Sequence, residues 1–336
     1  MKTAYTKGAK AMYLVFDVGA TFIKYAWMTS EGEILEKSKT PTPVARENTV
    51  EDFVRVIGNI YDMFKDKGIL DGIAMGLPGQ IDVKNGIVYT GGGLRYMDDV
   101  PLQQLLQERC DNVPVALEND GKCAALAEVW LGNAKDVKDA CVLVFGTGIG
   151  GALIKNRRVI HGKHLLSGEV SFIFEDMTRE EADTLPEGYP LMEARTTMEV
   201  VDELPYTWAT KRSTINMCHF VTLKKGLPDE AVTGEQVYAW AKAGDEDVIN
   251  ILEDMYFSIA KQCMNLYVIF DPEVILIGGG ISEEPEFLKG IQRYIDKLKR
   301  LSCVYKDICI DSCKFLNDSN LLGALYNFKL KYELEV

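Results

Sequence analysis

The sequence predicts an α/β protein made of two similar halves that face a shared cleft. Two observations support this prediction: one hairpin pattern occurs twice, and strand patterns alternate with helical patterns along the chain. In each hairpin an apolar run enters a turn rich in glycine and threonine and returns as a second apolar run. The two copies are Tyr13–Met28, YLVFDVGATFIKYAWM, and Cys141–Ile154, CVLVFGTGIGGALI.

The first half is expected to contain three consecutive strands, one helix, a buried strand and a second hairpin. The helix is predicted from the spacing of its apolar residues, a cap at Asn48 or Thr49, and Gly68 beyond its last turn. The second hairpin has Asn85-Gly86 at its tip. These elements are Tyr13–Asp17, Phe22–Thr29, Ile34–Thr40, Val50–Lys67, Leu70–Gly76 and Ile81–Tyr89.

The remainder is expected to repeat the order of three strands and then to become mainly helical. Ahead of the repeat lie a helix, a strand and a helix at Leu102–Arg109, Val113–Glu118 and Lys122–Leu131. After it come a strand at Arg158–Ile160, an acidic loop at Glu175–Glu187 and helices from Met192 onward, at Gly234–Ala243 and at Asp247–Asp271. The last elements are Val274–Ile277, Phe287–Leu301, Ile308–Asp311 and Asn320–Lys331.

The composition is typical of a two-domain protein with a large core. The chain has 336 residues, of which 47% are hydrophobic and 26% charged, and a domain holds about 100–200 residues. The net charge of −13 argues against nucleic-acid binding, which favours a basic surface. No apolar run reaches the length of about 20 residues that spans a membrane, and Met1–Met12 lacks the apolar region of a secretory signal. The eight scattered cysteines favour reduced thiols in the cytoplasm.

Asp17 is the first candidate for chemistry, because it ends a strand just before a tight turn. In one interpretation the turn binds phosphate and Asp17 reaches a magnesium ion directly or through water. In the other, Asp17 accepts local N–H bonds in an ordinary hairpin turn. The second turn, Gly146–Gly151, favours phosphate, because bare N–H groups let an anion approach. Alone, GTGIGG is a weak signal, since the chain there lacks the other features of a dinucleotide fingerprint or a P-loop.

Three further segments combine a strand end or a loop with polar or glycine residues. Asn119 and Asp120 follow a buried strand, where α/β proteins place ligands. Asp120 could take a proton from a hydroxyl while Asn119 holds a neighbouring polar group, although either could simply cap the next helix. Glu169 suits bidentate hydrogen bonding to vicinal sugar hydroxyls, or is a surface carboxylate. Gly278–Gly280 would let a ring or a ribose lie against the backbone, or form a common strand-to-helix turn.

Together these motifs resemble those of the ROK family of bacterial sugar kinases and sugar-responsive repressors, within the actin-like ATPase superfamily. The order and spacing of the motifs are specific, whereas no single motif is. The resemblance covers nearly all of the chain after Met12. It rests on DVGATFIK (Asp17–Lys24), GLPGQID (Gly76–Asp82), LENDGKCAALAE (Leu117–Glu128), GTGIGG (Gly146–Gly151), SGEVSF (Ser167–Phe172) and VILIGGGIS (Val274–Ser282).

The resemblance implies two RNase-H-like domains around a central cleft, one formed by 12–117 with 318–336 and the other by 118–317. It implies ATP and Mg²⁺ as cofactors, with Asp17 reaching the metal through water, and Asp120 as the base that activates a sugar hydroxyl, usually O6 of a hexose. The implied nucleotide-binding residues are Asp17, Gly19, Thr21, Lys24, Gly146, Thr147, Gly148, Gly278, Gly279 and Gly280. The implied sugar-binding residues are Gly79, Asn119, Asp120, Glu169 and Glu193.

Two departures from the family pattern affect the sugar site. The family's loop usually reads Gly-Glu-x-Gly-His, whereas Phe172 stands here in place of the histidine that contacts the sugar and often a structural zinc. The family's cysteine-rich zinc loop is also absent from Glu175–Leu191, so we expect no structural zinc, as in the zinc-independent branch. A metal site at Cys303, Cys309 and Cys313 is the alternative, but their spacing matches no zinc pattern.

The sequence therefore predicts a cytoplasmic, ATP-dependent, glucokinase-like hexose kinase. The family resemblance implies that it is a homodimer. A helix-turn-helix region before Tyr13 is missing, which argues against the repressor branch. One alternative is a non-catalytic sugar sensor on the same scaffold, although a sensor would not need the phosphate-binding turns. Another is a kinase for N-acetylmannosamine, fructose or a β-glucoside, because an aromatic residue at position 172 suits an apolar substituent.

Overall fold

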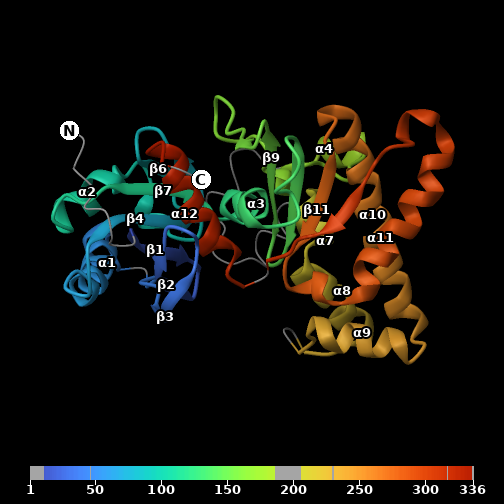
Figure 1. Ribbon diagram of the computed structural model, residues 1–336. Helices are drawn as coiled ribbons and strands as arrows, with labels where there is room; N and C mark the ends of the chain where they lie inside the picture. Colours follow the sequence, from blue (N-terminus) through green and yellow to red (C-terminus); the bar gives the residue numbers. More distant parts are fainter. Residues whose placement is uncertain (1–10, 46, 186–205, 229–230, 316, 335–336) are drawn as a thin grey trace. The chain divides into compact units, whose positions relative to one another are not determined.

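The chain forms two compact units, which Figure 1 shows with their helices and strands labelled. The computed structural model describes residues 11–45, 47–185, 206–228, 231–315 and 317–334. Unit 1 comprises the chain up to Lys135, the short segment His161–Leu166 and the chain from Asn317 onward. Unit 2 comprises Asp136–Ile160 and Ser167–Leu316. Each unit has its own sheet and its own hydrophobic core.

Unit 1 is built on a five-stranded sheet with the order β3-β2-β1-β4-β7. The first three strands form an antiparallel meander, and the last two join it in parallel. A separate antiparallel pair forms the predicted second hairpin, with Gly86 at a φ of 71° in its turn. The strands are β1 (Met12–Val18), β2 (Phe22–Thr29), β3 (Ile34–Pro41), β4 (Leu70–Leu77), β5 (Gln80–Asp82), β6 (Ile87–Thr90) and β7 (Val115–Asn119).

Two helices of unit 1 begin after a residue whose side chain caps them, Thr49 or Asn119. Thr49 accepts a hydrogen bond from the N–H of Asp52 and donates its own N–H to the Asp52 carboxylate, a capping box that starts α1. The buried face of α1 includes Phe53, Ile57 and Phe64, as its apolar spacing predicts. The helices are α1 (Val50–Phe64), α2 (Leu102–Arg109), α3 (Asp120–Leu131) and α12 (Ser319–Lys331), with a 3-10 turn, η1, at Arg95–Met97.

Helix α3 belongs to unit 1, whereas we expected the second domain to begin at residue 118. The reason is its packing against α12, which returns from the far end of the sequence (Figure 1). The rings of Trp130 and Tyr326 stack 5.5 Å apart, and Asn327 donates to the Leu117 carbonyl at 3.0 Å. Gly323 lies so close to Cys123 that a Cβ would meet the Cys123 carbonyl oxygen at 1.7 Å.

Unit 2 repeats the sheet arrangement of unit 1, in the order β10-β9-β8-β11-β12. Its first three strands are again antiparallel, and β11 pairs in parallel with both β8 and β12. The prediction of two similar halves is therefore confirmed at the level of sheet topology. The strands are β8 (Ala140–Phe145), β9 (Ile149–Lys155), β10 (Arg158–Val159), β11 (Val274–Gly278) and β12 (Ile310–Ser312).

The core of unit 2 gathers around the ring of Phe145, which contacts the rings of Trp208 and Phe287. The acidic segment expected as a loop contains a short helix, α4, whose N-cap is Thr178. The helices are α4 (Arg179–Ala182), α7 (Trp208–Arg212), α8 (Thr214–Lys225), α9 (Gly234–Lys242), α10 (Glu246–Phe270) and α11 (Pro285–Leu298). Short 3-10 turns are η2 (Val170–Phe172), η3 (Gly280–Glu283), η4 (Lys299–Leu301) and η5 (Cys303–Tyr305). No described helix combines the length and the apolar character that crossing a bilayer demands.

Candidate active site

Asp17 lies at the end of β1 with its carboxylate held by two side chains. The β1–β2 register places Lys24 opposite Asp17, and Lys24 Nζ lies 3.2 Å from Asp17 Oδ2. Asn320, in the first turn of α12, donates from Nδ2 to Asp17 Oδ1 at 2.9 Å. A carboxylate has about four acceptor positions, so positions remain for a ligand. Asp17 and Lys24 are expected from the sequence, whereas Asn320 is not, because no local pattern connects it to a residue 303 positions away.

The turn between β1 and β2 is fixed from behind by the segment that follows β3. The Gly19 N–H donates to the Phe22 carbonyl at 3.0 Å, and the Thr42 hydroxyl donates to the Gly19 carbonyl at 2.7 Å. The Thr42 N–H donates to the Thr21 carbonyl at 3.0 Å. Ala20 and Thr21 are exposed. The carbonyl groups of Gly19 and Thr21 are thus used inside the protein, while Ala20 and Thr21 are accessible to a ligand.

The turn between β8 and β9 is also held by hydrogen bonds and exposed at its tip. The Gly146 N–H donates to the Gly148 carbonyl, and the Thr214 N–H donates to the Gly146 carbonyl at 3.1 Å. A Cβ at Gly146 would meet no atom within 4 Å, and Thr147 is exposed. Neither Gly146 nor Gly148 has a positive φ. What they provide is an uncovered backbone.

A cavity of about 600 Å³ in unit 2 brings together two predicted nucleotide-binding segments, Gly146 of the β8–β9 turn and Gly280 after β11. Its volume is within the usual range for small-molecule sites. Gly279 has a φ of 96°, and a Cβ there would meet the Phe145 carbonyl oxygen at 2.0 Å, so only glycine fits. The cavity is lined by Phe145, Gly146, Thr214, Ile215, Thr233, Gly234, Glu235, Tyr238, Gly280, Ile281, Glu283 and Glu284.

One polar atom in the wall of this cavity has no protein partner. The Thr214 hydroxyl oxygen is buried and accepts or donates no hydrogen bond within the described residues. A buried polar group without a partner is unfavourable, and a polar ligand in the cavity would remove that cost. The neighbouring Tyr238 hydroxyl is also buried, and burial raises its pKa, so it stays neutral. Neither Thr214 nor Tyr238 belongs to a sequence motif, so neither is predictable from the sequence.

Asn119 and Asp120 form the junction between β7 and α3. Asn119 is the helix cap, as its ordinary structural interpretation predicts: its Oδ1 accepts the Lys122 N–H at 3.1 Å. Its Nδ2 donates to the Gly79 carbonyl at 3.1 Å, which ties the junction to the turn after β4. Asp120 is the first helical residue and is half-buried, with Oδ1 accepting the Gly121 N–H at 2.8 Å. The cap therefore fixes the backbone from which Asp120 projects.

Gly79 and Gly168 are required by their backbone conformations. Gly79 has a φ of 98°, and a Cβ there would approach the Thr90 carbonyl oxygen to 1.8 Å. Gly168 has a φ of 83° and lies against β9, where a Cβ on Gly151 would meet the Gly168 carbonyl oxygen at 2.5 Å. Glu169 follows directly and is partly exposed. Gly168 thus sets the course of the chain that presents Glu169.

The segment that carries Glu169 is anchored by a buried carboxylate that the sequence analysis placed in an acidic loop. The Glu175 side chain is 1% exposed. It accepts the Ser258 hydroxyl at 2.7 Å, and Arg212 Nε lies 3.3 Å from its other oxygen. The Trp208 indole N–H donates in turn to the Ser258 hydroxyl at 3.1 Å. No local signal marks Glu175, because Ser258 lies 83 residues away.

Phe172, Glu193 and the cysteine cluster are the remaining features of the prediction. Phe172 is 52% exposed on unit 2, and Glu193 lies outside the described residues. Cys303 and Cys309 are exposed, and the part of the chain that is described contains no cluster of three His, Cys, Asp or Glu side chains fit to hold a metal. Magnesium needs only one or two carboxylates because it keeps several waters, so Asp17 alone fits the metal that the resemblance implies.

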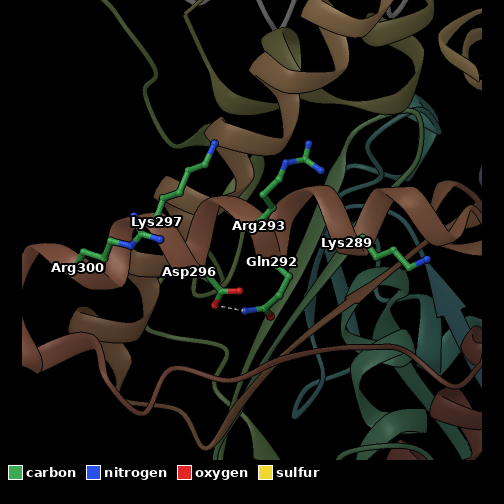
Figure 2. Close-up of a pocket in the computed structure, with 6 residues that line it drawn as sticks. All are labelled: Lys289, Gln292, Arg293, Asp296, Lys297 and Arg300. Carbon is green, nitrogen blue, oxygen red and sulfur yellow. Dashed lines mark hydrogen bonds between the residues drawn. The ribbon is translucent and has the colours of Figure 1, made fainter. Parts of the chain in front are cut away.

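A surface depression along α11 and the adjoining η4 contains none of the predicted site residues. Figure 2 shows that its six lining side chains all come from this region of the chain, with a hydrogen bond of 2.8 Å between Gln292 and Asp296. Arg293 is already paired with Glu253 and Glu286. The depression is a charged helix surface, lined by Lys289, Gln292, Arg293, Asp296, Lys297 and Arg300.

The two sheets and their turns identify the fold class of the protein. Two sheets of identical order, each starting with a meander around a glycine-containing turn, are the architecture of the actin-like ATPase fold, which the solved structures that match this chain share. The chain belongs to the ROK family, whose family model matches residues 13–181 and 212–330. The family and the fold expected from the motifs are thereby confirmed.

Several of the curated relatives are sugar kinases by name. A beta-glucoside kinase of Listeria monocytogenes is 30% identical over 313 residues, which are 93% of this chain and 96% of that protein. A beta-glucoside kinase of Klebsiella pneumoniae is 29% identical over 318 residues, 94% of this chain and 96% of that protein. Among solved structures, a ROK family protein from Streptococcus pneumoniae in complex with sucrose is 28% identical, with a TM-score of 0.77, and covers 96% of this chain and 99% of its own.

Proposed function

We propose that this protein is an ATP-dependent sugar kinase that transfers the γ-phosphoryl group to O6 of a glucosyl unit. The observation that carries the proposal is Asp120, a carboxylate on the first turn of α3 beside the Asn119 cap, in a chain 30% identical to a beta-glucoside kinase over 93% of its length. A non-catalytic sensor, our first alternative, would need neither this carboxylate nor two glycine-containing turns.

ATP would be bound by residues of the predicted nucleotide-binding turns. On unit 2, the cavity beside Gly146 and Gly280 would hold the nucleoside, and the Thr214 hydroxyl would regain a hydrogen-bond partner. On unit 1, the exposed turn at Thr21 would receive phosphate oxygens, and Asp17 would hold Mg²⁺ through water. When bound, the metal neutralises charge that develops on the phosphate oxygens.

Asp120 would act as the general base toward the acceptor sugar. The sugar hydroxyl oxygen bonds to the γ-phosphorus while the bond from that phosphorus to the ADP oxygen breaks, and Asp120 takes the hydroxyl proton. A positioned base contributes about 10²–10⁴-fold to rate. One Asn119 Nδ2 proton is used by the Gly79 carbonyl, which leaves the second for a sugar hydroxyl. Glu169, as the family resemblance implies, would bind vicinal hydroxyls of the sugar.

Two observations favour a β-glucoside over free glucose as the acceptor. The two relatives quoted above are beta-glucoside kinases of nearly the same length as this chain. Phe172, which replaces the histidine of the family motif, is 52% exposed and follows Glu169 by three residues. An exposed ring suits stacking on a second sugar or on an aromatic aglycone. Free hexoses and N-acetylmannosamine remain the comparison substrates.

The test compares wild type with Asp120→Asn, which keeps the shape and the oxygen that accepts the Gly121 N–H. Mg-ATP is mixed with cellobiose, phenyl β-glucoside, glucose, mannose, fructose or N-acetylmannosamine, and ADP release is followed by a coupled assay. We expect a loss of about 10²–10⁴-fold in kcat, with ATP binding and melting temperature retained. Asp66→Asn, at an exposed carboxylate in the turn that follows α1, is the matched control.

The outcomes separate the candidates. Sugar-dependent ADP release by Asp120→Asn close to that of wild type would remove Asp120 from the mechanism. Wild-type protein that binds ATP and sugar without turnover on any member of the panel would favour the sensor. If kcat/KM for glucose exceeds that for cellobiose and for phenyl β-glucoside, free glucose is the preferred acceptor, as the glucokinase-like prediction has it.

A further inference from the structure

Glu118, the residue before the proposed sugar-binding pair, carries a buried carboxylate that is bound by a histidine from a distant segment. The Glu118 side chain is 1% exposed. His161 Nε2 lies 2.9 Å from its Oε2 and 3.2 Å from its Oε1. Neither residue was given a role by the motifs. A buried carboxylate is retained only where hydrogen bonds and charge compensate for its lost hydration, and His161 supplies that partner.

The same carboxylate also binds the backbone of the active-site junction. β7 is an edge strand, and the N–H of its last residue, Asn119, donates to Glu118 Oε1 at 2.8 Å. The Glu118 side chain thus folds forward along its own strand and fixes the peptide group that leads into Asn119. Because the Asn119 side chain caps α3 and the next residue is Asp120, an error in this peptide would displace both proposed functional side chains.

His161 reaches Glu118 by a short excursion of the chain. The segment His161–Leu166 belongs to unit 1, although the residues on both sides of it, Ile160 and Ser167, belong to unit 2. The His161 side chain is 29% exposed. Within the described residues its Nε2 contacts to Glu118 are its only hydrogen bonds, so the carboxylate is the polar group that orients the imidazole.

We propose that His161 is a positioning residue for the acceptor-sugar site. By donating from Nε2 it holds the Glu118 carboxylate in the orientation that accepts the Asn119 N–H, and so keeps Asn119 and Asp120 at the correct place for the sugar hydroxyl. His161 acts through Glu118 and need not touch either substrate. The kinetic part of this inference rests on the proposed function, whereas the geometric part concerns the Asn119 peptide and does not.

Three substitutions at position 161 separate the hydrogen bond from side-chain bulk. His161→Gln places an amide N–H near the position of the lost Nε2 and preserves the bond. His161→Asn is equally polar but too short to reach Glu118, and His161→Leu fills the space without a donor. The matched control is His164→Leu, three residues along the same segment, where the side chain is exposed. Hydrogen exchange of a peptide that covers 115–121 and steady-state kinetics are measured on each purified variant.

The exchange measurement tests the geometry without any activity. We expect the Asn119 amide to exchange at least about tenfold faster in the Leu and Asn variants than in wild type, with Gln and the His164 control near wild type. Equal exchange in all five proteins would overturn the proposal, whether or not the protein is a kinase. If the His161→Leu protein does not fold, the comparison of His161→Gln with His161→Asn provides the test.

The kinetic measurement tests whether the geometry matters for the acceptor. We expect kcat/KM for the sugar to fall about 10- to 100-fold in the Leu and Asn variants, since a displacement near 1 Å can cost about 10²-fold. The KM for ATP should stay within about twofold of wild type, and Gln should restore most of the loss. Faster amide exchange with unchanged sugar kinetics would reduce His161 to a structural role and overturn it as a positioning residue. Absence of turnover in wild type would instead reject the proposed function.

Discussion

Gly323 is the position where the packing of unit 1 can be tested most sharply. A Cβ there would lie 1.7 Å from the carbonyl oxygen of Cys123, 2.4 Å from its carbonyl carbon and 2.7 Å from its Cα. All three atoms are backbone atoms of a buried helix, so no side-chain rotation can relieve the overlap. Carbon and oxygen normally approach to about 3.3 Å. In Gly323→Ala, α3 and α12 must therefore separate by roughly 1.5 Å.

The separation would affect both stability and the active site. Overpacking of a core costs about 1–3 kcal/mol, while alanine in place of a helical glycine contributes about 1 kcal/mol of stability. Because the clash is with backbone, we expect the cost to win and the protein to lose about 1–2 kcal/mol. The crossing lies three residues from Asp120 on α3 and three from Asn320 on α12. A displacement of that size there should lower kcat/KM about 100-fold.

The control is Gly58→Ala, another helical glycine with a close neighbour. Its Cβ would meet the Arg109 side chain at 2.3 Å, but that side chain is flexible and partly exposed, so it can move away. Guanidinium unfolding monitored by tryptophan fluorescence, together with steady-state kinetics, is measured on both variants. We expect Gly58→Ala to stay within about 1 kcal/mol of wild type with unchanged kinetics. A Gly323→Ala protein that is as stable and as active as wild type would refute the close packing of α3 and α12.

Three further predictions follow from side-chain contacts. Asn320→Ala should raise the Mg²⁺ concentration for half-maximal velocity about tenfold or more, because the Asp17 carboxylate loses its orienting hydrogen bond. The control, Asn327→Ala, lies two turns along the same helix and should lower only the unfolding midpoint. Equal Mg²⁺ curves for the two variants would contradict this prediction. Glu175→Ala should destabilise unit 2 by about 3 kcal/mol, measured by denaturant unfolding, with Glu175→Gln less affected. Iodoacetamide labelling of the native protein, measured by mass spectrometry, should modify the exposed thiols of Cys303 and Cys309 first. Burial raises the pKa of the buried thiols and so slows their reaction.

Local features of the fold were predictable because neighbouring residues determine them. The two glycine-containing hairpins, the cap at Thr49 and the Asn85-Gly86 turn depend on backbone preferences and on hydrogen bonds over three or four residues. The hairpin register also places Lys24 opposite Asp17, so that pair was accessible from the sequence. Helix ends were less accurate, as α1 ends at Phe64 before the glycine expected to stop it.

Long-range features could not be predicted from spacing alone. Asn320 meets Asp17 across 303 positions, and His161 meets Glu118 across 43. Neither contact leaves a periodic or compositional signal in one sequence. The same limit explains the domain boundary, since the assignment of α3 to unit 1 depends on its packing against α12. The contacts that sequence analysis misses here are therefore those that orient the predicted residues.

Asn119 and Asp120 show why a structural and a functional interpretation of the same residues need not compete. The cap uses Asn119 Oδ1 and one Nδ2 proton, so the amide retains a second proton for a ligand. Asp120 is placed in the first turn of a helix, where the unpaired N–H groups and the helix dipole favour a negative charge. A general base must be deprotonated before it can accept a proton. The cap that starts α3 therefore places the Asp120 carboxylate in the first turn of the helix without using the whole of the Asn119 amide.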